Sequence, residues 1–292
     1  MKSSKAEIRR RFHALPTIAF ESDGRLTSYA GLVVFQRLFA ELRLRGRFRA
    51  KLNHLSGGKI FSPVALMVLL IVHLLLGFRR LRGLDYYRDD TLVARIVGVT
   101  KLPNVATISR RLAGFDERAV LGIQDVSRDL VLERLAAECF KTVTLDFDGS
   151  VQSTKGHIEG TAVGFNKKKK GARSYYPLFC TVAQTGQFFD MHHRSGNVHD
   201  SNGALDFMLE CFEALIQQVP EAGIESRIDA AFFSDPVLAV METYDVLFSA
   251  SVHFRRFTKF KKLVENRKRW RTIDDEWSYF CLLYTSPSPR DA

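Results

Sequence analysis

A short segment at residues 142–150 constrains the fold of this chain more than any other feature. It reads Thr-Val-Thr-Leu-Asp-Phe-Asp-Gly-Ser, and its β-branched and aromatic residues predict a buried strand that ends at an acidic residue. Side chains alternate between the two faces of a strand. Asp146 and Asp148 therefore point the same way, opposite to Leu145 and Phe147.

A second strand end with an acidic residue occurs at residues 227–233, Arg-Ile-Asp-Ala-Ala-Phe-Phe. A single aspartate at a strand end is usually a turn-former or a cap, and Asp148 or Asp229 alone would be interpreted in that way. We predict instead that the two carboxylates meet at neighbouring strand tips and form one site.

The charge balance favours an anionic partner. The chain has 292 residues, with 43 Lys and Arg against 32 Asp and Glu and a formal net charge of +11. Nucleic acid is the commonest partner of so basic a protein. The length permits two domains or one large one, and a hydrophobic content of 46% is ample for a core.

The cysteines and the N-terminus indicate a cytoplasmic protein. The cysteines form no C-x-x-C pair and are scattered at Cys139, Cys180, Cys211 and Cys281. We expect reduced thiols rather than a zinc site or a disulfide framework. Residues 1–12 are basic but no apolar stretch follows them, so we expect no signal peptide.

The apolar segment Val64–Phe78 offers a different function class, a membrane-associated protein anchored by this segment. It is about fifteen residues long and contains His73, whereas a helix that spans a bilayer needs about twenty apolar residues. We favour a buried helix within a helical domain, and we expect no membrane partner.

The spacing of apolar residues changes at residue 141. Before it, helical spacing predicts helices, including those at 84–97, 106–115 and 125–140. After it, short segments predict an antiparallel meander of strands at 142–147, 161–165, 176–183 and 187–192. Helices at 202–219 and 235–242 then alternate with strands at 226–229 and 244–254. This order indicates a mixed α+β fold with helices on the faces of a mixed sheet.

The last residues, 281–292, do not fit the rest of the chain. One allowed choice of codons for residues 281–291 spells a DNA-sequencing adapter, so we interpret this tail as an artefact. A natural tail rich in proline and serine is the alternative. If the tail is an adapter, we expect the natural protein to continue beyond Phe280.

Two aspartates at adjacent strand tips suit phosphodiester chemistry. Two divalent ions about 4 Å apart, held by shared carboxylates, can activate the nucleophile and stabilise the leaving oxygen. Mg²⁺ prefers oxygen ligands and keeps several waters, so few carboxylates suffice. We therefore expect Asp148 and Asp229 to bind Mg²⁺ or Mn²⁺.

Four blocks in order resemble the DDE transposases of insertion sequences, which have a ribonuclease-H-like core. These blocks are residues 148–151, 164–178, 194–200 and 227–233. Residues 27–115 are similar to the helical N-terminal part of the same group, including Leu-Asp-Tyr-Tyr-Arg-Asp-Asp at 84–90. The resemblance implies a helical N-terminal region at 1–140 and the first part of a ribonuclease-H-like core at 141–260. The start of an insertion region at 261–280 and the tail at 281–292 follow, so the core is incomplete at its C-terminus.

The resemblance implies a role for each acidic residue. Asp148 matches the first metal-binding aspartate and Asp229 the second, with Asp146 as the competitor for the first. The third acidic residue of the family is a glutamate within a Tyr…Arg…Glu…Lys signature that is not found here. Glu265 could replace it, but an exposed helix surface is the interpretation we favour for that residue.

Basic residues predict where DNA binds. The densest cluster comprises Lys167, Lys168, Lys169, Lys170 and Arg173. Such side chains neutralise phosphates without reading sequence. A solvated loop is the alternative, although Tyr175 and Tyr176 follow directly and could order it.

Residues 89–115 resemble a helix-turn-helix in which Arg110 and Arg111 could contact DNA. An ordinary helical hairpin fits the same pattern. His192 and His193 are neighbours on a predicted strand and face opposite ways, so a shared metal site is not expected there.

The resemblance implies a transposase that cleaves and joins DNA strands at transposon ends. Its partners would be double-stranded DNA, namely terminal inverted repeats and target DNA, bound by a homodimer. The alternative is a catalytically inactive DNA-binding fragment that lacks the third acidic residue.

Overall fold

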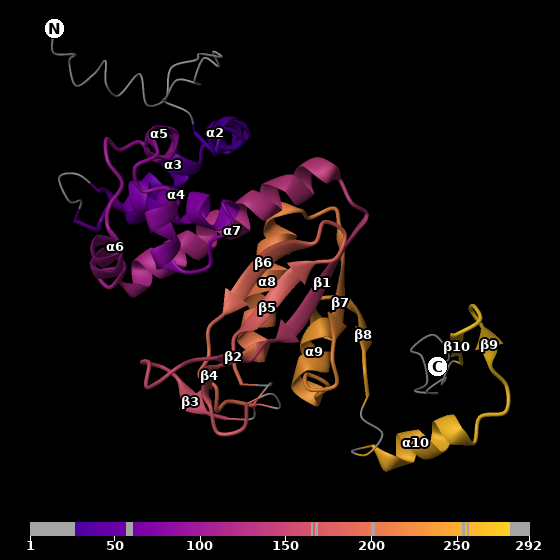
Figure 1. Ribbon diagram of the computed structural model, residues 1–292. Coiled ribbons are helices and arrows are strands. Elements are labelled where there is room, and N and C mark those ends of the chain that lie inside the picture. Colours follow the sequence, from indigo (N-terminus) through magenta and orange to yellow (C-terminus); the bar gives the residue numbers. More distant parts are fainter. Residues whose placement is uncertain are drawn as a thin grey trace, which may run out of the picture.

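The computed structural model describes residues 27–56, 61–164, 166, 169–199, 202–252, 255 and 257–280. Sequence predictions that lie outside the described residues concern residues 1–12, Lys167, Lys168, Asp200 and the tail at 281–292. Helices make up the first half of the described chain and a five-stranded sheet forms the centre of the second (Figure 1).

The helices before the first strand are α2 (Leu32–Glu41), α3 (Leu44–Leu52), α4 (Pro63–Leu75), the 3-10 helix η1 (Leu81–Tyr86), α5 (Thr91–Val97), α6 (Val105–Leu112) and α7 (Glu117–Glu138). Helix α4 is the apolar segment, and the Ser62 hydroxyl caps it by accepting the Ala65 N–H at 3.1 Å. Its side chains Val68, Leu69 and Val72 are buried in the core of the helical part.

His73 is the one polar interruption of α4, and the fold satisfies both of its ring nitrogens. Nε2 lies 3.0 Å from the Arg80 carbonyl oxygen, which can only accept. Nε2 therefore carries the proton, and Nδ1 accepts the Tyr87 hydroxyl at 2.6 Å. Burial raises the pKa of Tyr87 well above its usual range. No helix among the described residues is long and apolar enough to span a membrane.

Two of the predicted helices have different bounds. The segment 84–97 is not one helix, because Asp90 begins α5 by accepting the Val93 N–H at 2.9 Å and so separates it from η1. The helix predicted at 125–140 begins eight residues earlier, at Glu117. Asp116 caps it by accepting the Ala119 N–H at 2.8 Å. Both starts follow from the preference of aspartate for the N-cap.

Helix α7 belongs to two cores and joins the helical part to the sheet (Figure 1). Ala119 and Val126 pack with α3, whereas Val131, Leu132 and Leu135 pack beneath the sheet. Ion pairs connect α7 to both parts. Nζ of Lys51 in α3 donates to Oδ2 of Asp125 at 2.7 Å, and Nη1 of Arg128 donates to Oδ2 of Asp190 in β6 at 2.9 Å.

The main sheet is mixed, with strand order β6-β5-β1-β7-β8. Its strands are β1 (Thr142–Gly149), β5 (Leu178–Val182), β6 (Gln187–His192), β7 (Gly223–Ile228) and β8 (Leu247–Ala250). The β6-β5-β1 half is an antiparallel meander, and β1, β7 and β8 run parallel. The crossovers between the parallel strands contain α8 (Ala204–Gln218) and α9 (Asp235–Thr243).

The two faces of the sheet differ. Val143, Leu145 and Phe147 of β1 are buried against the helices of the main core. Asp146 is half-buried and Asp148 is exposed on the opposite face, as the alternation of the sequence predicts.

A small sheet of order β2-β4-β3 follows directly after β1. Its strands are β2 (Gln152–Ser153), β3 (Ala162–Val163) and β4 (Arg173–Tyr175). The strand predicted at 161–165 therefore does not belong to the main meander. The backbones of Gly164 and Gly196 lie in close contact beside this sheet. Only glycine fits at position 164, because a Cβ there would lie 1.6 Å from the Gly196 carbonyl oxygen.

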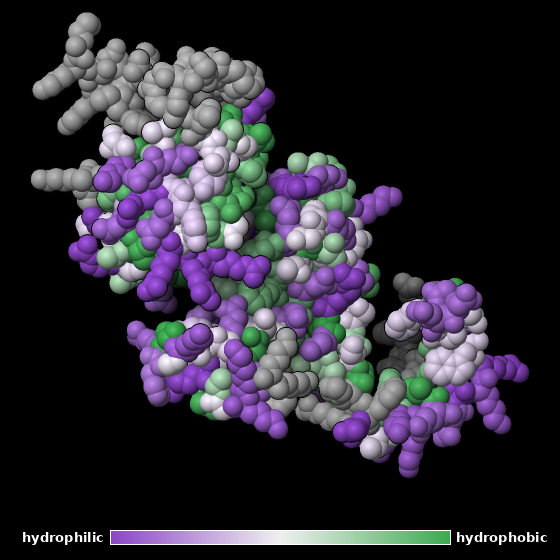
Figure 2. Space-filling model, viewed as in Figure 1, coloured by the Kyte–Doolittle hydropathy of each residue, from purple (hydrophilic) through white to green (hydrophobic). Residues whose placement is uncertain are grey.

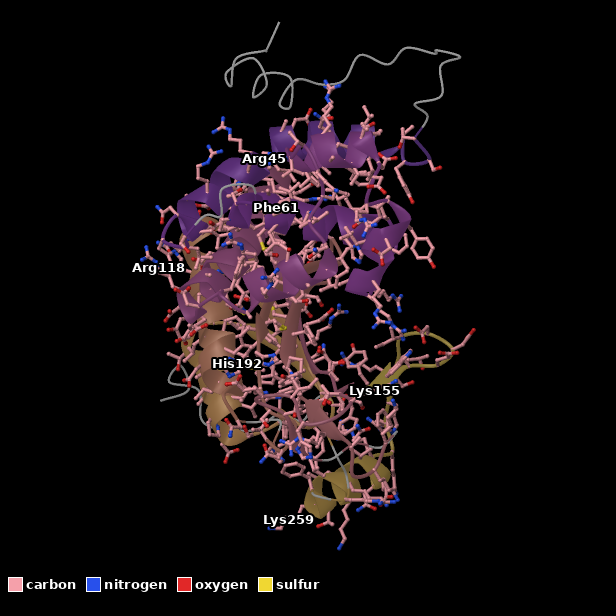
Figure 3. All side chains as sticks on the ribbon, turned by 60° about the vertical axis from the view of Figure 1, so that its left-hand side comes forward. Arg45, Phe61, Arg118, Lys155, His192 and Lys259 are labelled. Carbon is pink, nitrogen blue, oxygen red and sulfur yellow. The ribbon has the colours of Figure 1, made fainter. Side chains whose placement is uncertain are left out.

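The last described residues form α10 (Thr258–Glu265) and a hairpin of β9 (Arg271–Thr272) and β10 (Ser278–Tyr279). They lie beyond β8, outside the main sheet (Figure 1). Lys259 of α10 and Arg45 of α3 lie at opposite ends of the molecule (Figure 3).

Candidate functional site

The pairing of β1 with β7 brings Asp148 and Asp229 to adjacent positions. Phe147 is in register with Ile228, and the two aspartates are the next residues along these parallel strands. Residues in register project from the same face, and neighbouring strands lie about 4.8 Å apart. Both carboxylates thus start from adjacent backbone positions at the carboxyl ends of the two central strands.

Both aspartates are exposed, and they retain free oxygen atoms. The Asp148 carboxylate makes no hydrogen bond or ion pair with any described residue. Oδ1 of Asp229 accepts the Ala231 N–H at 2.9 Å, which fixes the turn after β7 and leaves Oδ2 available. The tips of β1 and β7 therefore offer carboxylate oxygens that the fold itself does not use.

These residues fit a hard divalent cation that keeps part of its water shell. Two carboxylates on one edge supply the oxygen ligands that Mg²⁺ and Mn²⁺ prefer, and water can complete the coordination. The described residues contain no group of three or more His, Cys, Asp or Glu side chains that could hold a metal ion. Any site here is thus a two-carboxylate site within the described part of the chain.

Asp146, the alternative to Asp148 as the first metal-binding aspartate, forms an ion pair with an arginine. Nε of Arg227 donates to Oδ1 of Asp146 at 2.5 Å, and Nη2 donates to Oδ2 at 2.8 Å. The two residues are in register on β1 and β7. Hydrogen bonding to Asp146, together with its negative charge, raises the pKa of Arg227. This geometry favours Asp148 over Asp146 as the residue that is free to bind a metal ion.

Glu265 is not part of this group. It lies at the end of α10, where Lys261 donates to it at 3.4 Å in an exposed pair one helical turn apart. These surroundings are those of an exposed helix surface, in agreement with the interpretation favoured from the sequence.

The loops after β1 are packed closely around the site. The Ser150 N–H donates to the Pro177 carbonyl oxygen at 3.1 Å. A Cβ on Gly149 would lie 2.5 Å from the hydroxyl oxygen of Tyr176. Only glycine leaves room for that hydroxyl, which explains the Asp-Gly pair at the strand end and connects the first block of the resemblance to the second.

The described residues of the basic cluster, Lys169, Lys170 and Arg173, lie just before and at the start of β4 in the small sheet. Lys169 and Lys170 are exposed. The Lys169 N–H donates to Oδ1 of Asn166 at 2.9 Å, and Nδ2 of Asn166 donates to the Ser153 hydroxyl at 2.8 Å. Hydrophilic and apolar side chains are mixed over the small sheet in Figure 2. We call the segment between β3 and β4, residues 164–172, the lysine loop. The fold thus exposes the side chains of Lys169 and Lys170 in this loop and anchors its backbone at Lys169.

Arg173 has a largely internal role. Its guanidinium donates to the carbonyl oxygen of Thr161, and Nε donates to the Thr161 hydroxyl at 3.0 Å. The side chain is half-buried and connects β4 to the turn before β3. Its contribution to a DNA surface would therefore be indirect, through the shape of the lysine loop.

The histidines at the end of β6 have different ring partners. The His193 ring packs against Tyr175 at 4.5 Å, whereas the His192 ring stacks on Phe207 of α8 at 6.0 Å. Burial, and then the nearby Arg194, lower the pKa of His192. These contacts give each ring a packing role.

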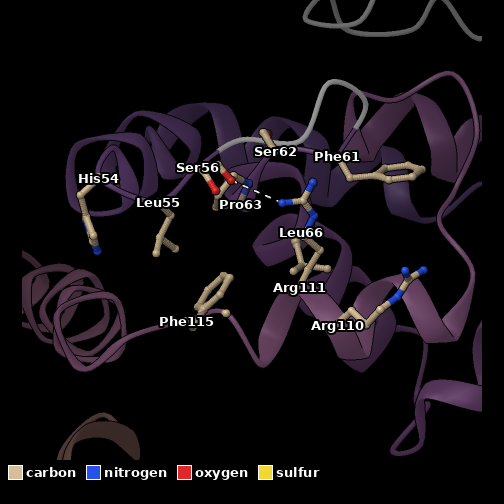
Figure 4. A pocket seen from close by; sticks show the side chains of 11 residues that line it. His54, Leu55, Ser56, Phe61, Ser62, Pro63, Leu66, Arg110, Arg111 and Phe115 are labelled. Atoms are coloured by element: carbon tan, nitrogen blue, oxygen red, sulfur yellow. Dashed lines mark hydrogen bonds between the residues drawn. The ribbon is translucent and has the colours of Figure 1, made fainter.

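Arg110 and Arg111 lie in the last turn of α6, in the helical part. Neither has a carboxylate partner among the described residues. They border a cavity of about 310 Å³ beside the start of α4, where Nη1 of Arg111 donates to the Ser56 carbonyl oxygen at 3.4 Å (Figure 4). No described carboxylate therefore neutralises either guanidinium.

Arg227 is a residue of the site that the sequence interpretation missed. It stands two positions before Asp229 and so shares the face of that residue. A parallel pairing of the strands that end at Asp148 and Asp229, with these two residues side by side, would have placed Arg227 beside Asp146. The signal was present, but it depends on knowing which strands are neighbours.

Comparison with known families gives a match over most of the chain. The model of a family described as transposase DDE domain, group 1, matches residues 14–273. No curated protein matches the chain.

Solved structures give distant likenesses. A piggyBac transposase in a synaptic complex with hairpin DNA is 12% identical with a TM-score of 0.43, and the alignment covers 80% of this chain and 54% of that one. The Drosophila P element transposase in a strand transfer complex is 11% identical with a TM-score of 0.32, covering 78% and 50%. The Mos1 transposase in a pre-cleavage transpososome is 12% identical with a TM-score of 0.27, covering 81% and 84%. The chain thus spans about half the length of the piggyBac protein.

Proposed function

Because the chain belongs to the group 1 DDE transposase domain family, we propose that it acts in the cleavage and strand transfer of DNA at transposon ends, with Asp148 and Asp229 as metal ligands. The observation that supports this assignment most is the register of β1 and β7, which pairs Phe147 with Ile228, the residues directly before the two aspartates. Family membership supports DNA transposition in general.

Asp148 and Asp229 would hold Mg²⁺ or Mn²⁺ through the oxygens that the fold leaves unused. When bound, the metal supplies an activated water and stabilises the charge on the leaving oxygen. Hydrolysis of one phosphodiester yields a 3′-hydroxyl and a 5′-phosphate. In strand transfer, the 3′-oxygen forms a new bond to a phosphorus of target DNA while the bond to the target's own 3′-oxygen breaks.

The exposed lysines of the small sheet would bind the DNA backbone. Lys169 and Lys170 follow the tip of β1 through the small sheet, and Lys167 and Lys168 precede them in the sequence. Arg173 would shape this loop from within. Arg110 and Arg111 would contact the double-stranded DNA of the terminal inverted repeats from the helical part. We propose that a homodimer holds two such ends.

The test of the metal assignment is the nicking of a supercoiled plasmid that carries transposon ends, in the presence of Mn²⁺. We expect Asp148→Asn and Asp229→Asn to remove the cleavage that the unchanged chain shows. Glu265→Gln is the matched control, because it removes an exposed carboxylate that pairs only with Lys261 among the described residues. Cleavage that persists in both aspartate variants would refute the assignment.

A second candidate function is DNA binding without cleavage. It is favoured by the absence of a three-carboxylate group from the described residues. A gel shift that weakens steeply with salt, combined with no nicking by the unchanged chain, would support this function for the present chain.

The lysine assignment has its own test. Each phosphate contact contributes about 0.9 to the slope of log affinity against log salt. We expect Lys169→Ala/Lys170→Ala to reduce that slope by about 1.8. Arg37→Ala serves as the control, since Arg37 already pairs with Glu41 at 2.9 Å. An equal slope in the lysine variant and the control would exclude the lysine loop from the DNA surface.

A further inference from the structure

A row of charged and polar pairs follows β1 and β7 along the open face of the sheet. The first pair is Thr144 and Glu225, whose hydroxyl and carboxylate are joined by a hydrogen bond of 2.8 Å. The second is Asp146 and Arg227, with two hydrogen bonds of 2.5 and 2.8 Å. The third position holds Asp148 and Asp229, the proposed metal ligands.

Each carboxylate in this row has a side-chain partner until the strand tips are reached. Glu225 accepts a hydroxyl, and Asp146 accepts both arms of a guanidinium. No described cation forms an ion pair with Asp148 or Asp229. The arrangement therefore separates one neutralised aspartate from two that remain available, although all three share one face.

The short distance between Asp146 and the strand tip makes the charge of Asp146 important for a cation bound there. Two residues along a strand are about 6.6 Å apart, so an unpaired Asp146 would act strongly on a divalent ion at the tip. The planar fork of arginine binds both oxygens of a carboxylate at once. A single lysine or a hydroxyl could not hold Asp146 in this way.

We propose that Arg227 is a positioning residue, which neutralises Asp146 and keeps that carboxylate out of the metal site formed by Asp148 and Asp229. This inference rests on the proposed function. If Arg227 acts in this way, the affinity for the metal depends on the net charge of the Asp146–Arg227 pair. Asp146 itself does not bind the metal.

The charge balance predicts opposite effects for the two single variants. Arg227→Met removes a positive charge near the site, so Mn²⁺ should bind about fivefold more tightly at low ionic strength. Asp146→Asn leaves the arginine without its partner, so Mn²⁺ should bind about fivefold more weakly. Asp146→Asn/Arg227→Met restores the net charge and should bind as the unchanged chain does. Arg227→Lys keeps the charge but not the planar fork that holds both oxygens of Asp146, so its Mn²⁺ affinity should lie between that of Arg227→Met and that of the unchanged chain.

The experiment is calorimetric titration of each variant of this chain with Mn²⁺ at low salt. Melting temperatures measured without metal verify that each variant is folded. The inference is supported if the single variants shift affinity in opposite directions and the double variant returns to the starting value.

Two results would overturn the inference while leaving the proposed function intact. If Asp146→Asn and the double variant both lose binding to the extent that Asp148→Asn does, Asp146 is itself a ligand. If none of the Asp146 and Arg227 variants changes affinity, the pair only stabilises the sheet. Mn²⁺ binding that is unaffected by Asp148→Asn and Asp229→Asn would instead refute the proposed site, and the inference with it.

Discussion

Replacement of Arg128 by methionine should destabilise the protein by about 2 kcal/mol. Arg128 of α7 donates to Oδ2 of Asp190 at 2.9 Å, and the two side chains are 26% and 7% exposed. Removal of one partner from a fully buried ion pair costs about 3–5 kcal/mol, because the other charge remains buried. The expected effect is smaller here because Arg128 is partly exposed. Asp190 also keeps a 2.7 Å hydrogen bond from the Met191 N–H.

Thermal unfolding followed by circular dichroism measures this effect. For a chain of 292 residues, about 2 kcal/mol corresponds to a decrease of about 3 °C in melting temperature. Asp190→Asn in the same background removes the buried charge and should recover much of the loss. Arg134→Met is the control, since Arg134 and Glu138 form an exposed pair at 3.5 Å that is expected to contribute little. If Arg128→Met and Arg134→Met lower the melting temperature equally, the reasoning about the buried aspartate is wrong.

Three further predictions follow from single contacts. Tyr87→Phe leaves Nδ1 of buried His73 without its 2.6 Å hydrogen bond, so urea denaturation should show a loss of about 1–3 kcal/mol. Gly164→Ala places a Cβ 1.6 Å from the Gly196 carbonyl oxygen, so limited proteolysis should cut the lysine loop faster than in Gly31→Ala, where an added Cβ meets nothing within 4 Å. Burial lowers the pKa of His192 from 6.5, so the folded chain binds fewer protons there than the unfolded one. The contribution of His192 to the free energy of unfolding should be fully present above about pH 6.5 and should be lost as the pH drops through the folded-state pKa. His192→Gln should therefore flatten the pH dependence of the melting temperature. Equal behaviour of each variant and the unchanged chain would contradict the corresponding contact.

The sequence predicts well those helices and strands in which apolar residues recur with one regular spacing over many positions. Polar and apolar residues alternate over the seven residues Thr142–Asp148 of β1, and this alternation in the sequence assigns the two faces of the strand. The apolar α4 is recognised from its length and from His73, whose two hydrogen bonds explain how a polar ring is buried there. The mixed sheet follows from the order of strands and helices.

The elements that were misplaced depend on single residues or on short strands. Asp90 and Asp116 start helices through one side-chain hydrogen bond each, although many aspartates at other positions start none. Strands of two or three residues, such as β2 and β3, are too short to show any period. They belong to a region in which the backbones of Gly164 and Gly196 approach closely, which is a tertiary contact.

The candidate site could be predicted only in part for the same reason. The sequence pointed to Asp148 and Asp229 as strand-end carboxylates, but their adjacency depends on β1 pairing with β7 in one particular register. A slip of one residue would move one carboxylate to the buried face. The pairing of Asp146 with Arg227 depends on that register too, so it became visible only in the fold.

The sharing of α7 between two cores has a mechanical consequence. A helix of 22 residues is about 33 Å long and behaves as a stiff rod. A tilt of about 5° at the end packed on α3 would displace the other end by about 3 Å. Any rearrangement of the helical part would therefore be transmitted along α7 to the edge strand that carries Asp190.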